Sequence, residues 1–532
     1  MAVRILQVVG GMNRGGTETR LMRPATISGS GPGRPRPAAS SVLLLQLVPL
    51  MASLVMLAAY WSMARPPDFV VWLFCVIFTV HFGWGFWSWQ AATGRYIDSY
   101  SLFFASLCLF NGGHMVLWAV GLSDGCDLFE RFPEETTCRT LLLVNAGVTA
   151  FHFAGLLACV FREGRRRQGP APRSESTQRE PYDVSRIRLL GVLFVAASFP
   201  LAVSQAIKSF ELVADKGYMA LYQQDLKTGI ANWDSLLPMF LMPGVLFFYA
   251  GWHRSASARI FCWGLATAYA VTDLLLGLRN PAVMSGLSIA LFHEAVVRKI
   301  PRAAIVGIGV VVLGLLPLVA RVRDQKQEDR YDSIFQGIED NPMVAVIRET
   351  GGSACTIAHT VDLVPRVRDY DYGVGYWYAA LTVIPNFFGD RHMTVERGKF
   401  SNWLIWAVDP ETAQRGGGLG YSVVAEAYAN FSIFGPSLVL GLLGFGLAEF
   451  ASWVRARPHA FRYAVEAVVL TSLPVLARAE TADICRLVVW TSLVPYLFVT
   501  LTGSFRNHRR VPIESPLPCG SSAGLPKWRE AV

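Results

Sequence analysis

Residues 415–431 read Arg-Gly-Gly-Gly-Leu-Gly-Tyr-Ser-Val-Val-Ala-Glu-Ala-Tyr-Ala-Asn-Phe. This stretch closes a polar segment, 321–432, that interrupts a sequence otherwise built of apolar runs. Its glycines allow the backbone to adopt positive φ and to approach a ligand closely. Arg415 precedes them, and Glu426 and Asn430 follow at a spacing that puts both on one face of a helix. A flexible loop leading into a membrane helix has the same composition, so spacing alone leaves both interpretations open.

Apolar runs long enough to cross a bilayer recur along nearly the whole chain. Of 532 residues, 52% are hydrophobic and only 16% are charged. A crossing helix needs about 20 apolar residues, and in hydrocarbon every backbone polar group must be satisfied within the helix. The sequence therefore predicts an all-α, polytopic membrane helix bundle. About twelve spans are expected, at 42–63, 69–89, 100–121, 140–161, 189–207, 236–252, 260–278, 281–297, 303–320, 433–453, 463–477 and 484–503.

Lys and Arg concentrate in every second loop, whereas the intervening loop 122–139 is acidic. Because cytoplasmic loops are enriched in Lys and Arg, both termini are expected in the cytoplasm. The predicted organisation is a disordered arm 1–41, a membrane domain 42–503 and a disordered tail 504–532. Within the membrane domain, 162–188 is a cytoplasmic loop and 321–432 is a large extracytoplasmic loop after the ninth helix. The net charge of +9 does not indicate nucleic-acid binding, because the cations lie in short inter-helix loops.

The first 22 residues differ from the rest of the chain. A short apolar strand pattern runs into Gly10-Gly-Met-Asn-Arg-Gly-Gly16, which resembles the opening of a family 4 glycosyltransferase of the GT-B fold. One strand without a sheet cannot form a dinucleotide-binding half. We therefore assign this segment no activity.

Arginines recur beside predicted outer turns. Arg279 lies in the turn 276–281, Arg348 is followed by Glu349 in a helical pattern that ends at two glycines, and Arg478 lies in the last outer turn. An arginine at membrane depth is costly, which favours a functional partner, although a side chain that snorkels to the interface fits the spacing equally well. No cluster of His and Cys has the spacing of a metal site, so no cofactor is expected.

Residues from about 190 to 503 resemble the bacterial O-antigen and exopolysaccharide repeat-unit polymerases of the Wzy type. The resemblance rests mainly on 418–431 with Gly435. Weaker support comes from 217–222, 277–279, 348–352 and Arg478. Ser432 stands where family members commonly have glycine, and the first four helices match only in hydropathy.

The resemblance implies a metal-independent glycosyltransferase of GT-C-like architecture in the bacterial inner membrane. Its substrates would be undecaprenyl-diphosphate-linked glycans at the outer leaflet, with membrane lipids around it and a chain-length regulator and a flippase as possible partners. Fixed guanidinium groups would stabilise the departing diphosphate, and a carboxylate or imidazole would take the proton of the attacking hydroxyl. The catalytic candidates are Glu349 and Glu426, with His359 and His392 behind them. The substrate-binding candidates are Arg279, Arg348, Arg415, Gly418, Tyr421, Asn430 and Arg478.

Two other functions fit a bundle of this size. An O-antigen ligase uses the same lipid-linked donor, and nothing in the sequence identifies the acceptor. A transporter of polysaccharide or lipid-linked oligosaccharide often has two similar six-helix halves. Here the long loops follow the fourth and ninth predicted helices, which disfavours such halves.

Overall fold

The computed structural model describes residues 38–63, 67–168, 182–217, 220–221, 237–301, 303, 341–384 and 399–508. Within these ranges every regular element is a helix, which confirms the predicted all-α class. Most of the predicted arm, most of the tail and the ninth predicted span except residue 303 lie outside the described residues. The first described helix starts at Ala39, inside the predicted arm, and the last ends at His508, beyond the predicted boundary at 503.

Two groups of membrane helices come from the first 300 residues. The first group contains α2 (Ala39–Leu45), α3 (Leu47–Ser62), α4 (Asp68–Thr93), α5 (Ser99–Ala119), the short α6 (Asp127–Glu130) and α7 (Glu134–Gln168). The second contains α8 (Val184–Lys216), the 3₁₀ turn η1 (Leu237–Phe240), α11 (Leu241–Trp252), α12 (Ala256–Leu275) and α13 (Arg279–Val296). Each group contributes to a separate hydrophobic core, one around α4, α5 and α7 and one around α8 and α11.

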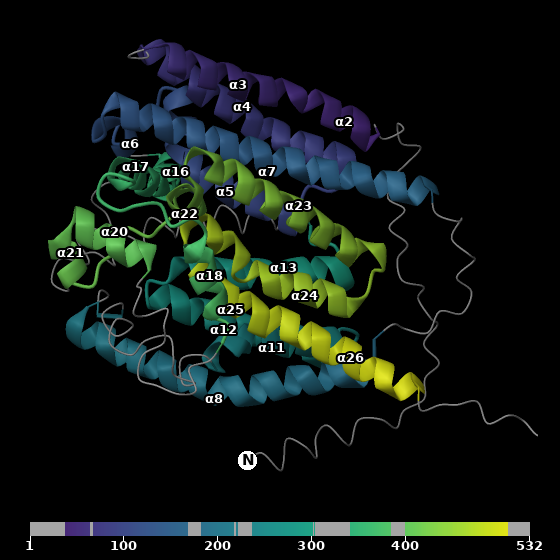
Figure 1. Ribbon diagram of the computed structural model, residues 1–532. Helices are drawn as coiled ribbons and strands as arrows, with labels where there is room; N and C mark the ends of the chain where they lie inside the picture. The colour runs from purple at the N-terminus through teal and green to yellow at the C-terminus, as the bar shows by residue number, and fades with distance from the viewer. Residues whose placement is uncertain are drawn as a thin grey trace, which may run out of the picture. The chain divides into compact units, whose positions relative to one another are not determined.

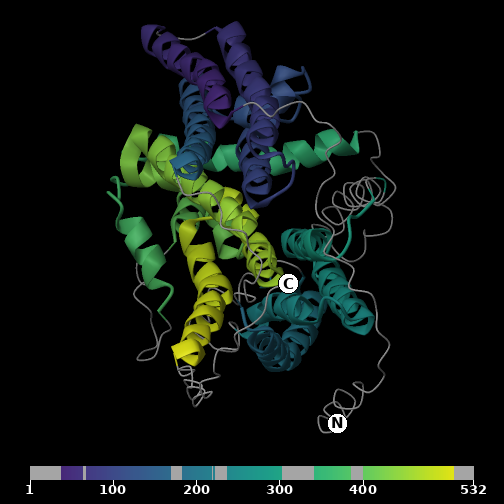
Figure 2. The same cartoon turned by 90° about the vertical axis from the view of Figure 1, so that its right-hand side faces the viewer.

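The C-terminal helices connect the two groups. They are α23 (Gly435–Ala456), α24 (Ala460–Leu470), the 3₁₀ helix η3 (Leu473–Arg478), α25 (Thr481–Val488), the π-helical turn η4 (Val489–Leu493) and α26 (Val494–His508). Helix α23 packs along α7, while α24 packs on α11 and α13 (Figures 1 and 2). The α7–α23 contact is close because Gly444 lies against the Phe151 carbonyl, where a Cβ atom would come within 2.1 Å of the oxygen. Small residues are the usual means of such close packing between membrane helices.

Within the residues that the structure describes, eight continuous helical segments are long and apolar enough to cross a membrane. They are Ala39–Ser62, Asp68–Thr93, Ser99–Ala119, Glu134–Arg165, Val184–Lys216, Val423–Ala456, Ala460–Arg478 and Thr481–Thr502. The sixth to eighth predicted spans correspond to α11, α12 and α13, which are helical but fall short of this criterion of length and apolarity. The chain is thus a multi-pass membrane bundle, and the count of twelve crossings stays a prediction.

The described part of the polar segment 321–432 packs on the bundle. It contains α16 (Pro342–Gly351), α17 (Ser353–Leu363), α18 (Val374–Leu381), α20 (Phe400–Val408), α21 (Pro410–Gln414) and α22 (Val423–Phe431), followed by the 3₁₀ turn η2 (Ser432–Phe434). Helix α16 packs on α5, α17 on α7, and α18 on α25. The Trp490 indole donates a hydrogen bond of 2.8 Å to the Val383 carbonyl, so the chain just beyond α18 reaches the middle of the last apolar helix.

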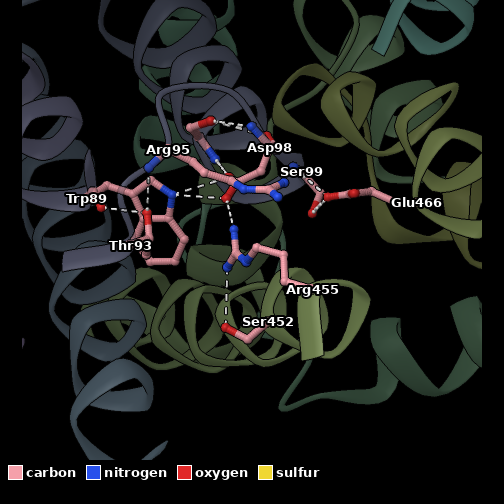
Figure 3. Close-up of polar contacts among 9 residues, drawn as sticks. Trp89, Thr93, Arg95, Asp98, Ser99, Ser452, Arg455 and Glu466 are labelled. Atoms are coloured by element: carbon pink, nitrogen blue, oxygen red, sulfur yellow. Dashed lines mark hydrogen bonds and ion pairs between the residues drawn. The ribbon is translucent and has the colours of Figure 1, made fainter. Parts of the chain in front are cut away.

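Several loops with clustered cations meet at one end of the bundle. Arg462 donates to the Tyr182 hydroxyl at 2.8 Å, and Arg188 donates to the Gly251 carbonyl at 2.9 Å. Figure 3 shows a further junction at this end, where Asp98 caps α5 and pairs with Arg455 of α23. These contacts agree with the alternation of basic loops in the sequence. Which side of the membrane this end faces stays a prediction.

Candidate functional site

At the end of the bundle opposite the basic loops, Asn111 of α5 forms hydrogen bonds with two other parts of the chain. Its side chain is fully buried, and its amide nitrogen donates a hydrogen bond of 3.0 Å to the carbonyl of Ala477, next to Arg478. Its amide oxygen accepts from the Ser422 hydroxyl at 2.5 Å. Ser422 is the N-cap of α22, where its oxygen also accepts from the Val424 and Ala425 amides. One buried amide therefore fixes the glycine-rich stretch and the last outer turn against the same helix.

Helices α5 and α16 cross with their backbones in contact at Gly113 and Gly351. A Cβ atom on Gly113 would lie 2.8 Å from the Ile347 carbonyl oxygen, and one on Gly351 would lie 2.6 Å from the His114 amide nitrogen. Neither contact can be relieved by rotating a side chain, because the atoms met belong to the backbone. A hydrogen bond of 2.9 Å between His114 Nε2 and the Arg348 carbonyl holds the crossing together.

Helix α16 presents Arg348 and Glu349 in different directions. Glu349 pairs with Arg279 at the start of α13, where one of the two hydrogen bonds from the guanidinium to the carboxylate measures 2.8 Å. The Arg279 side chain is 13% exposed and that of Glu349 is 40% exposed. Bidentate pairing of this kind fixes the orientation of both groups. This pair links the second group of helices to α16.

The Arg348 guanidinium lies over the loop before α6. Gly125 has a φ of +73°, and a Cβ atom there would come within 3.4 Å of Arg348 Nε. The adjacent Cys126 thiol is buried, which raises its pKa to about 11, while the positive charge of Arg348 opposes that shift. Cys126 and Cys138 are both free thiols.

Arg478 contacts the glycine-rich stretch directly. Gly420 has a φ of +72°, and a Cβ atom there would lie 3.4 Å from Arg478 Nε. The Tyr421 amide donates to the Arg478 carbonyl at 3.3 Å. The sequence predicted that a ligand could closely approach a glycine of this stretch. In the structure, the group close to Gly420 is the side chain of Arg478. Gly418 lies further out, with the Gly420 nitrogen 4.0 Å from a Cβ built on it.

Glu426 is buried among helix ends. It is 1% exposed, and its Oε2 atom accepts from both the amide and the hydroxyl of Thr481, each at 2.8 Å. Because Thr481 is the first residue of α25, the carboxylate satisfies an amide that the helix leaves without an internal partner. Asn430, also buried, donates to the Glu426 carbonyl at 2.9 Å. The predicted shared helix face is therefore turned inward.

A second carboxylate, that of Glu480, caps the N-terminal end of α20 in the same way. It accepts from the Phe400 amide at 3.0 Å and from the Ser401 hydroxyl at 2.6 Å. The Phe400 ring stacks on the buried Tyr421 ring at 5.7 Å between centroids, and the Arg368 guanidinium lies 4.5 Å from the Phe400 centroid on α20. Tyr421 thus belongs to the packing beneath the glycine-rich stretch.

The structure brings some of the predicted site residues together and separates others. Arg279, Arg348 and Glu349 gather around α16, and α5 connects α16 to Arg478 through the residues 111–114. Arg415 caps the C-terminal end of α21, where its side chain is 73% exposed and lies 3.4 Å from the Glu411 carboxylate. Of the histidines, His359 packs edge-on against Phe132 at 4.6 Å, while His392 lies outside the described residues.

Sequence reasoning missed Asn111 and His114, because the first four helices matched the family only in hydropathy. The signal was present as Asn-Gly-Gly-His inside an apolar helix, since polar side chains at membrane depth are costly and usually functional. No group of three or more His, Cys, Asp or Glu residues that could hold a metal ion occurs in the described ranges. Metal independence stays a prediction.

The fold and this site define a class, the multi-pass membrane proteins with arginines and carboxylates from distant helices gathered at one end of the bundle. Residues 49–509 match the family model of the O-antigen polysaccharide polymerase Wzy, so the chain belongs to that family. No curated protein and no solved structure was found to match the chain. Membership implies O-antigen repeat-unit polymerisation by glycosyl transfer in a membrane, acting on a lipid-linked glycan.

Proposed function

We propose that the protein joins undecaprenyl-diphosphate-linked repeat units at the outer face of the inner membrane, without a metal ion. The non-reducing end of one unit attacks the anomeric carbon of the growing chain, and polyprenyl diphosphate leaves. The observation that supports this most directly is that α16 and the turn that carries Arg478 both pack on α5. Helix α16 carries Arg348 and, through Glu349, holds Arg279. Guanidinium groups fixed in advance stabilise negative charge that develops on a diphosphate, as a divalent cation would.

The two candidate carboxylates receive different roles in this proposal. Glu349 is accessible, but two of the Arg279 N–H groups point at its oxygens, so we assign it to hold that arginine towards the diphosphate. Glu426 is buried and caps α25, so we assign it to hold the turn that carries Arg478. Arg415, Gly418, Tyr421 and Asn430 remain proposed contributors to substrate binding, either directly or by shaping the glycine-rich stretch.

Deletion of the gene tests the proposal through the surface polysaccharide, separated on a gel. Loss of a polymerase leaves single repeat units attached to the lipid A core. Loss of a ligase leaves the core without any repeat unit, and loss of a flippase traps lipid-linked units inside the cell. We expect the first pattern. The second pattern would identify the protein as a ligase and the third as a flippase, and either would refute the proposal.

Complementation with variants then tests the arginine arrangement. We expect the Arg279→Ala variant to insert into the membrane but to yield only single repeat units. The Glu349→Ala variant should behave in the same way. Arg131→Ala is a matched control, because this arginine is exposed and pairs with Asp127, four residues earlier in the chain. Normal ladders from the Arg279 and Glu349 variants would refute the assignment.

A further inference from the structure

Three histidines are buried in the first group of helices, and two of them are fully partnered. His81 of α4 bonds Gln46 at 3.0 Å and Thr149 at 3.4 Å, one contact from each ring nitrogen. His152 of α7 likewise bonds Ser88 at 2.7 Å and the Tyr100 hydroxyl at 3.1 Å. These two rings behave as expected of histidines in a membrane core, where each polar atom needs a partner.

His114 of α5 is different. The residue is 2% exposed, and Nε2 contacts the Arg348 carbonyl, but Nδ1 has no hydrogen-bond partner among the described residues. A carbonyl oxygen only accepts, so Nε2 must carry the proton. In the neutral ring Nδ1 is then an acceptor with an available lone pair. Leaving a buried acceptor without a donor costs about 1–3 kcal/mol of stability. A histidine with a purely structural role would not explain why the protein carries this cost.

The position of His114 connects this nitrogen with the candidate site. His114 follows Asn111 by three residues on α5, which places both on one side of that helix. Its other nitrogen holds the Arg348 carbonyl, and its backbone touches Gly351 across the crossing. The charged groups that act on the ring are Arg348 on α16 and Asp127 and Glu130 on α6. His114 therefore lies beside Arg348, one of the residues assigned to the substrate.

We propose that His114 Nδ1 accepts a hydrogen bond from the attacking hydroxyl of the acceptor sugar and takes its proton during transfer. The hydroxyl oxygen bonds to the anomeric carbon, and the bond from that carbon to the diphosphate oxygen breaks with its electron pair leaving on the diphosphate. The hydroxyl proton moves to Nδ1, and the imidazolium returns it to water before the next cycle. This assignment rests on the proposed polymerase function and supplies the proton acceptor that Glu349 and Glu426, in their observed contacts, do not.

The test uses the purified full-length protein in lipid nanodiscs with a lipid-linked repeat unit as substrate. His114→Gln keeps a side-chain N–H that can reach the Arg348 carbonyl but has no nitrogen that takes up a proton. We expect this variant to keep the thermal midpoint and KM of the parent protein, with kcat lower by about 10²–10⁴-fold. The acidic limb of the kcat–pH profile should disappear in the same variant. His152→Gln and His81→Gln are the matched controls and should keep both kcat and that limb.

A normal kcat for His114→Gln would overturn the inference while leaving the polymerase function intact. A parent protein that makes no polymer in nanodiscs and whose deletion leaves ladders unchanged in cells would instead refute the function, and with it this assignment. If His114→Gln does not fold, turnover by His114→Ala with added imidazole tests whether His114 is the proton acceptor. Saturable recovery of turnover by imidazole supports Nδ1 as the proton acceptor, and the absence of recovery in a folded variant excludes it.

Discussion

Glu426 and Thr481 join two parts of the chain that both carry candidate site residues. The carboxylate of Glu426 accepts from the Thr481 amide and hydroxyl at 2.8 Å each, so α22 is fastened to the first turn of α25. Arg478 lies just before that turn and against Gly420 just before α22. The position of Arg478 therefore depends on a buried carboxylate that does not itself face solvent.

The role of Glu426 is tested by comparing Gln with Ala at this position. Glu426→Gln keeps an oxygen that accepts from Thr481, so we expect a nearly unchanged thermal midpoint in detergent and a normal polysaccharide ladder. Glu426→Ala leaves a buried amide unsatisfied and should cost about 1–3 kcal/mol. If Glu426→Gln folds normally but yields only single units, the carboxylate is catalytic, as the sequence alone predicts.

Arg478 and Arg415 should differ in their effects. Arg478 is held against Gly420, whereas the Arg415 side chain is 73% exposed on α21. We expect Arg478→Ala to abolish long chains, and Arg415→Ala to shorten them by a few-fold at most, with a larger effect at low ionic strength. The modal chain length on a gel measures both. Equal and complete loss would mean that Arg415 contacts the substrate directly.

The α5–α16 crossing should tolerate no side chain. Gly113→Ala places a methyl group within 2.8 Å of the Ile347 carbonyl, and such overpacking typically costs about 1–3 kcal/mol. We expect a lower thermal midpoint and shorter chains. Gly83→Ala is the control, because nothing lies within 4 Å of its Cβ and alanine favours a helix. A Gly113→Ala protein as stable as the control would show that the helices do not cross here.

Stability should depend on pH through Glu480, in the turn before α25. Burial, and next the charge of Asp483, raise the pKa of Glu480 in the folded protein. The folded protein then holds this proton more tightly than the unfolded chain, so its contribution is present at acidic pH and is lost as the pH rises through the folded pKa. We expect Glu480→Gln to flatten the fall of the thermal midpoint from acidic to neutral pH.

The exposed Glu411 provides the comparison for that measurement. Its side chain is 83% exposed, so Glu411→Gln should leave the pH dependence of the thermal midpoint as it is in the parent protein. An identical slope for the Glu480 variant and the parent would show that Glu480 does not titrate within this range.

Much of the local structure could be predicted from the sequence. The helix Pro342–Gly351 ends at the two glycines 351 and 352, and the turn at Gly277 separates α12 from α13, both as expected. Such features depend on a few neighbouring residues. Whether the four candidate arginines lie together depended instead on helix packing. The structure groups Arg279 and Arg348 around α16 and places Arg415 at the end of the separate helix α21.

The sequence by itself determined that this is a multi-pass helical membrane protein of the Wzy family, because the length and apolarity of each run and the spacing of the 418–431 block are local properties. Only the tertiary structure decided which residues meet. Arg279 pairs with a carboxylate 70 positions away, and Asn111 bonds a serine 311 positions away. Such contacts depend on how closely helices pack. At the α5–α16 crossing the packing is set by Gly113 and Gly351, each of which lies against the backbone of the other helix.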